Sequence, residues 1–463
     1  MDNVASSLGK ECHLPPPVEE KGSYDVVCVG FGPAALSLAV AIHEQKEPLR
    51  VLFLEQKSQF SWRGDQVPSG SSPMRTTLLQ DLVAQRNPLS KFTFINYLWS
   101  TNNLISFTNL GLTHPPRKVF SQYLNWCVEH INRLGWVHYG QDVQGIEAVT
   151  RDGGAVDHWR ITVKDVATGE STSVLADKVL LAVGAQPTIP DCFRDAASAG
   201  KAFHSADFTT CIPQLTESLD RAIEVAVVGD DDEAVEIFEH CRSLRWKGNA
   251  TLFSRDVALR QKDGSPFVGS LIANNSNVPY EQRASTGQNQ LSIQQDALNS
   301  LYLKQYAQLI KRPDPESHRY QVRASSEVVG VERADSSDQI NLRLRNQSTN
   351  SDETSKPFDF VFVASGYNRK LQERLLAPLA GLGDSRQGNV SVDGEYKVIF
   401  RRGSVVPSAG IWVLDAFDTA STDAFSYLAV RTNKVLKSLY HSQTLKNKRQ
   451  SLRGDSFEER AVL

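Results

Sequence analysis

The stretch that decides the fold runs Tyr24-Asp25-Val26-Val27-Cys28-Val29-Gly30-Phe31-Gly32-Pro33-Ala34-Ala35. It opens as a β-branched, apolar run of the kind that forms a buried strand, and a glycine turn follows at once. Leu36, Leu38, Ala39 and Ile42 then give the next segment an apolar helical face. Arg50 to Leu54 is a second strand of the same type, so this order predicts the βαβ unit of a dinucleotide-binding fold.

The glycine turn fits the G-x-G-x-x-G/A pattern with Gly30, Gly32 and Ala35. The first glycine allows a tight turn, the second lets a pyrophosphate approach the backbone, and the small third residue lets the helix pack close to its strand. The helix N-terminus offers free N–H groups and a positive dipole end to phosphates. Glu55, at the end of the second strand, is placed to bind ribose hydroxyls. The structural alternative is a glycine turn without a ligand.

A second βαβ unit is predicted farther along the chain. It has a strand from Glu224 to Val228, a turn at Gly229, a helix through Phe238 and a strand from Ala250 to Phe253. Four more elements are predicted: strands at Asp177–Val183, Ile340–Leu344 and Phe358–Ala364, and a helix at Phe425–Tyr440. Outside these elements we expect a disordered leader (1–21) and a flexible tail (446–463).

Composition excludes several classes of partner. The 463 residues carry a formal net charge of −3, without the basic excess that would favour nucleic acid or an anionic membrane. No apolar stretch reaches the roughly 18 residues of a membrane span. The six cysteines are scattered and the histidines lack metal-ligand spacing, so we expect no metal site. Reduced cysteines, and hence a cytoplasmic location, are expected.

Beyond the first turn, whole segments resemble the flavin-dependent ornithine and lysine N-hydroxylating monooxygenases of siderophore biosynthesis. The likeness extends from about Tyr24 to Tyr440. Its strings are Phe60-Ser61-Trp62, Met74 through Asn96 (MRTTLLQDLVAQRNPLSKFTFIN), Phe107 to Cys127, Arg255-Asp256, Asp263 to Val268, Ala364 to Arg369 and Ala429-Val430-Arg431.

The resemblance implies an α/β fold with two dinucleotide-binding (Rossmann-like) domains. The FAD-binding domain is expected in two segments (22–219 and 356–445), with the NADPH-type domain inserted between them (220–355). It also implies a reaction: NADPH reduces FAD, molecular oxygen adds to the flavin C4a, and the resulting hydroperoxide transfers oxygen to a small-molecule amine. Because an alkyl amine has an ordinary pKa of about 10.4, it must be bound so that a neutral fraction reacts. The flavin carries the chemistry, so no catalytic side chain is required. Tetramers are common in the family, which makes a homo-oligomer the expectation.

The resemblance assigns cofactor residues as well. Trp62 and Met74 lie near the flavin, and Arg75 stands where the family has a flavin-contacting glutamine. Arg255 matches an arginine expected to meet the 2′-phosphate of NADPH. Tyr367 belongs to one of the matching strings and is assigned to cofactor binding.

Two departures from the family pattern concern the second turn and the substrate. Asp231 replaces the middle glycine of the second turn, among Asp230, Asp232 and Glu233, and such charges should weaken phosphate binding by roughly several tenths to a few kcal/mol each. Gln80 replaces a lysine that holds the substrate carboxylate, and glutamine cannot supply that charge. The other expected substrate residues are Asn274 and Ser285, near the positions of two family asparagines, and Ser426, which matches a family serine.

The main hypothesis is therefore an FAD-dependent monooxygenase acting on an amine or related nucleophile, with NADPH use weakened by Asp231. The family's leucine pair before the serine reads Ala424-Phe425 here. Because Gln80, Ser285 and Phe425 differ from the family, the expected substrate is a larger, less charged amine, such as a secondary-metabolite intermediate, and not free ornithine. Two alternatives remain open: an FAD-bearing oxidase or isomerase that has lost NADPH use, and a non-catalytic relic.

Overall fold

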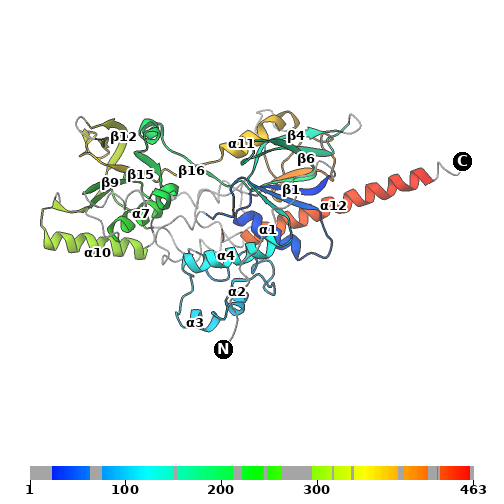
Figure 1. Ribbon diagram of the computed structural model, residues 1–463, viewed down its shortest axis with the longest axis horizontal. Coiled ribbons are helices and arrows are strands. Elements are labelled where there is room, and N and C mark those ends of the chain that lie inside the picture. The colour runs from blue at the N-terminus through cyan, green and yellow to red at the C-terminus, as the bar shows by residue number, and fades with distance from the viewer. Residues whose placement is uncertain are drawn as a thin grey trace, which may run out of the picture.

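Two helix-covered sheets lie side by side along the long axis of the protein (Figure 1). The computed structural model describes residues 23–62, 74, 76–150, 154–211, 222–243, 248–261, 293, 295–314, 317–334, 338–383, 391–414, 425 and 428–458. The predicted leader lies outside these residues. We call the part around the first sheet the first unit and the part around the second sheet the second unit.

The first sheet is mixed and has the order β3-β2-β1-β6-β5-β4, with β17 beside the C-terminal half of β6. The C-terminal half of β6 is parallel to β1 and β17, whereas its N-terminal half is antiparallel to β5. The strands are β1 (Tyr24–Val29), β2 (Val51–Glu55), β3 (Val137–Tyr139), β4 (Gln141–Val149), β5 (His158–Asp165), β6 (Ser171–Leu181) and β17 (Gly410–Val413).

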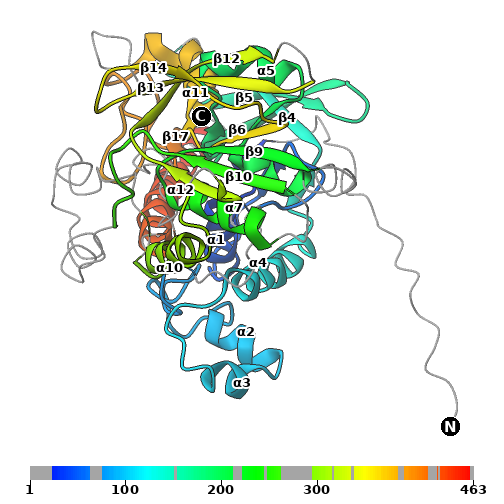
Figure 2. The ribbon, with the colours of Figure 1, turned by 90° about the vertical axis from the view of Figure 1, so that its left-hand side faces the viewer.

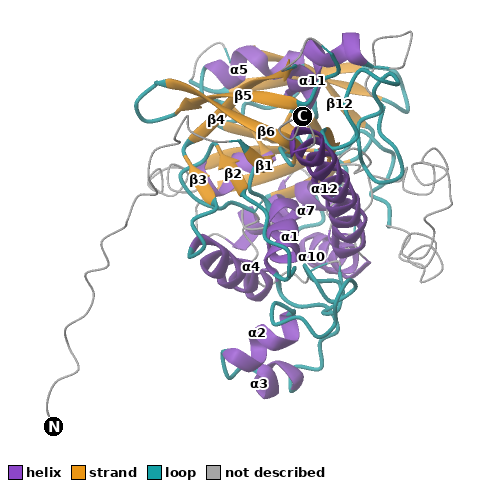
Figure 3. Ribbon diagram, turned by 90° about the vertical axis from the view of Figure 1, so that its right-hand side faces the viewer, coloured by secondary structure: helices purple, strands orange, loops and turns teal. Residues whose placement is uncertain are grey.

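One face of this sheet is covered by helices that also extend below it in Figure 1: α1 (Pro33–His43), α2 (Phe94–Ser100), α3 (Leu104–Thr108), α4 (Arg117–Asn132) and α12 (Leu428–Glu458). The opposite face is covered by α11 (Lys370–Leu376) and the 3-10 helix η5 (Ala377–Leu382). Helix α1 packs against α4 and α12, and Figure 3 shows α12 running past α1. Val26 and Cys28 of β1 face this helical layer, while Val27 and Val29 pack into the core on the opposite face. Burial on both faces explains the uninterrupted apolar run of β1.

The second sheet is parallel, with the order β11-β10-β9-β15-β8. Figures 1 and 2 show α7 and α10 below this sheet. An antiparallel sheet, β12-β13-β14, adjoins it. The strands are β8 (Ala202–His204), β9 (Ile223–Val228), β10 (Gly248–Phe253), β11 (Tyr320–Arg323), β12 (Ser326–Arg333), β13 (Ile340–Asn346), β14 (Asp352–Thr354) and β15 (Phe360–Val363). The helices are η2 (Asp191–Phe193), α5 (Arg194–Ser198), η3 (Ser205–Asp207), α7 (Asp232–Ser243) and α10 (Gln295–Lys311).

The chain crosses between the units through two short paired strands, β7 (Gln186–Pro187) and β16 (Tyr367–Asn368). The second sheet therefore takes in β8 and β15, which lie outside the predicted range of 220–355. That range was too narrow because β8 is only three residues long and β15 has the same apolar pattern as the strands of the first sheet. A strand at the edge of a sheet is identified by its neighbour and not by its own sequence.

The last helix also differs from the sequence-based expectation. Helix α12 continues to Glu458, so residues 446–458 of the predicted flexible tail are helical. The residues from Lys446 to Arg453 are mostly lysine, arginine, glutamine and leucine, which have high helix propensity, and proline is absent from this stretch. Figure 1 shows this end of the helix reaching beyond the body of the protein.

Cysteine and membrane expectations can be compared with the described residues. The five described cysteines are free thiols: Cys28, Cys127, Cys192, Cys211 and Cys241. Within the described ranges, no helix has the length and apolar character needed to cross a membrane. The same ranges contain no group of three or more His, Cys, Asp or Glu side chains arranged to hold a metal ion.

Candidate functional site

The first glycine turn lies at the C-terminal ends of β1 and β6. Gly30 has φ +92°, and a Cβ atom added to it would lie 2.5 Å from the carbonyl oxygen of Ala182, which directly follows β6. A side chain at this position is excluded by both conformation and space. A Cβ on Gly32 would meet nothing within 4 Å, so the backbone there is open to a ligand.

The N-terminus of α1 is free to receive an anion. Gly32 is the N-cap residue and Pro33 follows as the first helical residue, with no side-chain cap and no acidic residue in the first turn. The carboxylate of Glu55 lies beside the turn, where its Oε2 accepts a hydrogen bond from the Phe31 N–H at 2.7 Å. Ala35 is buried in the helical layer. An open backbone, an uncapped helix end and an acid at the end of β2 fit a dinucleotide.

Aromatic side chains from distant segments meet in the first unit. The ring of Trp62 lies 5.9 Å from Phe120 and 5.7 Å from Phe425, centroid to centroid, and Phe120 and Phe425 are 4.9 Å apart. Met74 is buried in the same core, and its N–H donates to the Pro115 carbonyl at 2.7 Å. The structure therefore places Trp62, Met74 and Phe425, the residue before Ser426, in one core.

Gln80 lies half-buried in the loop between β2 and α2. Its side-chain oxygen Oε1 accepts a hydrogen bond from the Thr77 N–H at 2.8 Å. The amide oxygen is thus held by a local turn, and the Nε2 amide group is the polar end left to meet a ligand. An amide N–H donor can serve a neutral carbonyl or hydroxyl, but it brings no charge to a carboxylate.

Asp81 holds the same loop from inside. Its carboxylate accepts N–H bonds from Val83 (2.8 Å), Ala84 (2.6 Å) and Phe94 (2.7 Å). Burial raises the pKa of Asp81 above its ordinary value, although these backbone donors oppose the shift. Such a buried acceptor with three donors fixes the loop conformation and, with it, the position of Gln80.

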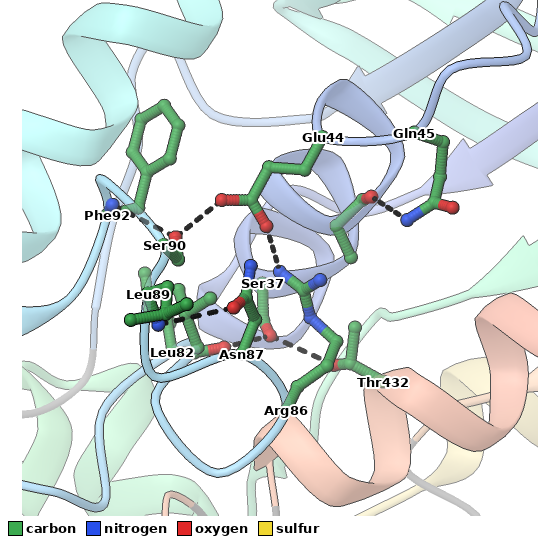
Figure 4. A network of polar contacts seen from close by, with 12 residues as sticks. Ser37, Glu44, Gln45, Leu82, Arg86, Asn87, Leu89, Ser90, Phe92 and Thr432 are labelled. Atoms are coloured by element: carbon green, nitrogen blue, oxygen red, sulfur yellow. Dashed lines mark hydrogen bonds and ion pairs between the residues drawn. The ribbon is translucent and has the colours of Figure 1, made fainter.

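Further contacts attach the loop to α1, and α1 in turn to α12 (Figure 4). The Ser37 hydroxyl donates to the Leu82 carbonyl at 2.7 Å and lies 2.9 Å from the Thr432 hydroxyl. Arg86 forms an ion pair with Glu44 at 2.5 Å. These contacts were not predicted from the sequence, because each joins positions far apart in the chain.

In the second turn, the first glycine, Gly229, has no room for a side chain. A Cβ on Gly229 would lie 2.9 Å from the Cβ atoms of both Ala234 and Ala364. Asp231, in place of a glycine, is the N-cap of α7, and its Oδ1 accepts the Ala234 N–H at 3.0 Å. An N-cap carboxylate uses one of the free N–H groups that would otherwise meet a phosphate.

The neighbouring acids have other partners. The Ser254 hydroxyl donates to the buried Asp230 carboxylate at 2.5 Å, and Asp232 is buried at the first position of α7. The Tyr367 hydroxyl donates to Glu233 at 2.9 Å. Of the four acids in this turn, Asp231 is therefore the one that caps the helix end.

Comparison with known proteins agrees with this geometry. The family model for L-lysine 6-monooxygenase/L-ornithine 5-monooxygenase matches residues 22–369, most of the chain. The chain belongs to this family. An L-ornithine N(5)-monooxygenase from Ajellomyces capsulatus is 31% identical over 90% of this chain and 91% of its own length. One from Pseudomonas aeruginosa is 30% identical over 90% and 94%. The solved structure of the ornithine hydroxylase PvdA from Pseudomonas aeruginosa aligns with a TM-score of 0.78, at 26% identity, over 91% of this chain and all of that one.

Membership of the monooxygenase family confirms the predicted fold class and enzyme class. The family consists of flavin-dependent N-hydroxylating monooxygenases, so the chain is an oxidoreductase of that class. The comparisons do not support the oxidase, isomerase and relic alternatives.

The remaining predicted residues of this family member divide into two groups. Arg255 is exposed just beyond the end of β10, and Tyr367 lies in the crossing strand β16, where its ring is 4.9 Å from His204. Arg75, Asn274, Ser285 and Ser426 lie outside the described residues, so their roles stay predictions.

Asp231→Gly is expected to tighten NADP⁺ binding by about 3- to 30-fold, because it removes a negative charge from the helix end that receives the phosphates. Loss of the cap to glycine should cost only a few tenths of a kcal/mol of stability. A titration of the FAD-loaded protein with NADP⁺ measures the change. Asp231→Asn, which keeps a capping oxygen without the charge, separates charge from bulk. An unchanged dissociation constant in both variants would contradict the expectation.

Proposed function

We propose that this chain is an FAD- and NADPH-dependent monooxygenase that N-hydroxylates a primary amine lacking a free carboxylate at the Gln80 end of its site. The observation that carries the proposal is the fixed amide of Gln80, which offers a neutral donor where the family resemblance places a cationic lysine. A substrate with an amide, ester or hydroxyl in that position matches this donor. A diamine offers no acceptor there, but it has no carboxylate that would be buried without a partner.

The first turn is proposed to hold FAD, with its pyrophosphate at Gly32 and the N-terminus of α1 and its ribose at Glu55. The Gly229 turn is proposed to hold NADPH, with Arg255 at the 2′-phosphate. Trp62, Met74, Arg75 and Tyr367 are assigned to cofactor binding. Bound FAD supplies the activation of molecular oxygen once NADPH has reduced it. The FAD domain is then the first unit, and the NADPH domain is the second unit between the two crossing strands.

The chain's own contribution is to bind the amine, exclude water and favour its neutral form. The rings of Trp62, Phe120 and Phe425 form an apolar cluster. Phe425 directly precedes Ser426 in the sequence. An amine buried beside such rings loses hydration of its charged form, which lowers its pKa and raises the nucleophilic fraction. Gln80, Asn274, Ser285 and Ser426 are proposed to orient the rest of the substrate.

Assembly and location are also proposed. Helix α10 has five exposed large apolar side chains: Tyr302, Leu303, Tyr306, Leu309 and Ile310. A homo-oligomer would cover such a surface. The free cysteines support a cytoplasmic location.

The test is to mix FAD-loaded protein anaerobically with NADPH, and then to assay three amines in air: ornithine, ornithine amide and putrescine. Bleaching of the oxidised flavin band by NADPH is expected. The kcat/KM for the amide and for putrescine should exceed that for ornithine by about 10- to 100-fold, because an unpaired carboxylate is costly to bury. Preference for ornithine would overturn the substrate assignment. Reduction by dithionite but not by NADPH would overturn the cofactor assignment.

A further inference from the structure

One ion pair joins the two units directly. The Nη1 of Arg117, at the start of α4 in the first unit, lies 2.8 Å from the Oε2 of Glu236, on α7 in the second unit. Their side chains are only 9% and 16% exposed. Charges removed from water in this way interact strongly and are costly to leave unpaired.

The position of Arg117 is not explained by its own helix. It is the first residue of α4, after Pro116, which provides no side-chain cap. A cation is disfavoured at a helix N-terminus, where the dipole is positive. The carboxylate of Glu236, from the other unit, neutralises this charge. Arg117 therefore stabilises the contact between the units, although its charge disfavours the start of its own helix.

A second contact, from the crossing strand β16, involves the same part of α7. Glu233, one turn before Glu236, accepts the hydrogen bond of Tyr367 from the crossing strand β16. Residues three apart share a helix face, so both acids point to the side of the crossing strand and α4. The core of the second unit receives other side chains of the helix, namely Ala234, Val235, Ile237, Phe238 and Cys241. Figures 1 and 2 both show α7 on the side of the second unit that faces α1 and α4.

We propose that the Arg117–Glu236 ion pair is a positioning contact that sets the orientation of the second unit against the first, and thereby aligns NADPH bound at the α7 turn with FAD bound at the α1 turn. The alignment part rests on the proposed function. Asp231 of the nucleotide turn is the N-cap of helix α7, so a contact that fixes α7 also fixes the turn. A shift of about 1 Å between reacting groups can cost about two orders of magnitude in rate.

The test uses the FAD-loaded full chain and four variants: Glu236→Gln, Glu236→Arg, Arg117→Glu and the double swap of Arg117→Glu with Glu236→Arg. Two quantities are measured: the small-angle X-ray scattering curve, compared at equal oligomeric state, and the limiting rate constant of flavin reduction by NADPH. Each charge reversal should change the scattering curve and lower that rate constant by at least about tenfold, with the NADPH dissociation constant changed by less than about threefold. The swap should restore both quantities, and Glu236→Gln should be intermediate.

Glu239→Arg is the matched control. Glu239 lies one turn farther along α7, its side chain is 20% exposed, and its partners Lys304 and Arg242 belong to the second unit. This variant should lose stability without changing the scattering curve or the reduction rate.

Unchanged scattering in both charge reversals, or a folded swap that fails to rescue them, would overturn the proposal. An equal effect of Glu239→Arg would also overturn it, because the loss would then reflect damage to α7. If NADPH does not reduce the wild-type protein, the proposed function fails on its own and the scattering curves still decide whether the pair sets the orientation.

Discussion

Gly30→Ala is expected to yield protein that retains no FAD and is destabilised by about 3 to 5 kcal/mol. The φ of +92° is unfavourable for alanine, and the new Cβ would lie 2.5 Å from the carbonyl oxygen of Ala182. That oxygen is backbone at the end of the central strand, so relief requires the sheet itself to shift. The ratio of flavin to protein absorbance after purification measures cofactor loading, and urea unfolding measures stability.

Gly32→Ala is the control for this prediction, because it makes the same chemical change two residues away. Gly32 has φ −88° and open space around it. Its unfolding free energy should stay within about 1 kcal/mol of wild type, while FAD affinity falls by about tenfold or more because the methyl group occupies the approach of the pyrophosphate. If both variants unfold alike, or if Gly30→Ala keeps its flavin, the distinct roles of the two glycines are wrong.

The first βαβ unit could be predicted because its determinants are local. The strand Tyr24–Val29 was predicted with the observed bounds, and the next strand was displaced by one residue. Apolar runs, a glycine turn and an acid at the end of the second strand are consecutive in sequence, so short-range pattern is sufficient. The same reasoning located β9, the start of α7 and β10 to within a few residues.

Features that depend on distant pairing could not be predicted. Strand β8 is recognised only by its parallel pairing with β15, and the Arg117–Glu236 ion pair joins positions 119 residues apart. The sequence also indicated a cluster of four acids at the second turn without showing how they divide. The structure assigns Asp231 to the helix cap and Asp230 to a buried contact with Ser254. Tertiary partners, and not composition, decide which of these charges meets a phosphate.

Gln80 lies between these cases. Its assignment to the substrate site, in place of a family lysine, came from the resemblance alone. The hydrogen bond from Thr77 to its Oε1 depends on a turn that no periodic pattern announces. That bond adds a directional statement to the prediction, since it leaves the amide N–H group as the polar end available to a substrate.

Gln80→Lys is expected to raise kcat/KM for free ornithine by about 10- to 100-fold, because a charge-assisted hydrogen bond to the carboxylate contributes about 1.5 to 3 kcal/mol. The activity on ornithine amide should stay level or fall, since the amide carries no matching charge. Loss of the Thr77 hydrogen bond should cost about 1 kcal/mol of stability. The measurement is the rate at which the hydroxylamine product forms from each amine. The control is Gln80→Met, which removes the polar group without adding charge.

The deciding quantity is the ratio of the two kcat/KM values within one preparation. Poor folding, low flavin content or slow reduction by NADPH lowers the turnover of both amines together and leaves this ratio unchanged. A ratio that shifts toward ornithine in Gln80→Lys but not in Gln80→Met therefore reports the charge at this position and nothing else. A ratio equal to that of wild type would show that the carboxylate end of an amino acid does not approach Gln80, and the substrate would then have to be oriented by Asn274, Ser285 or Ser426.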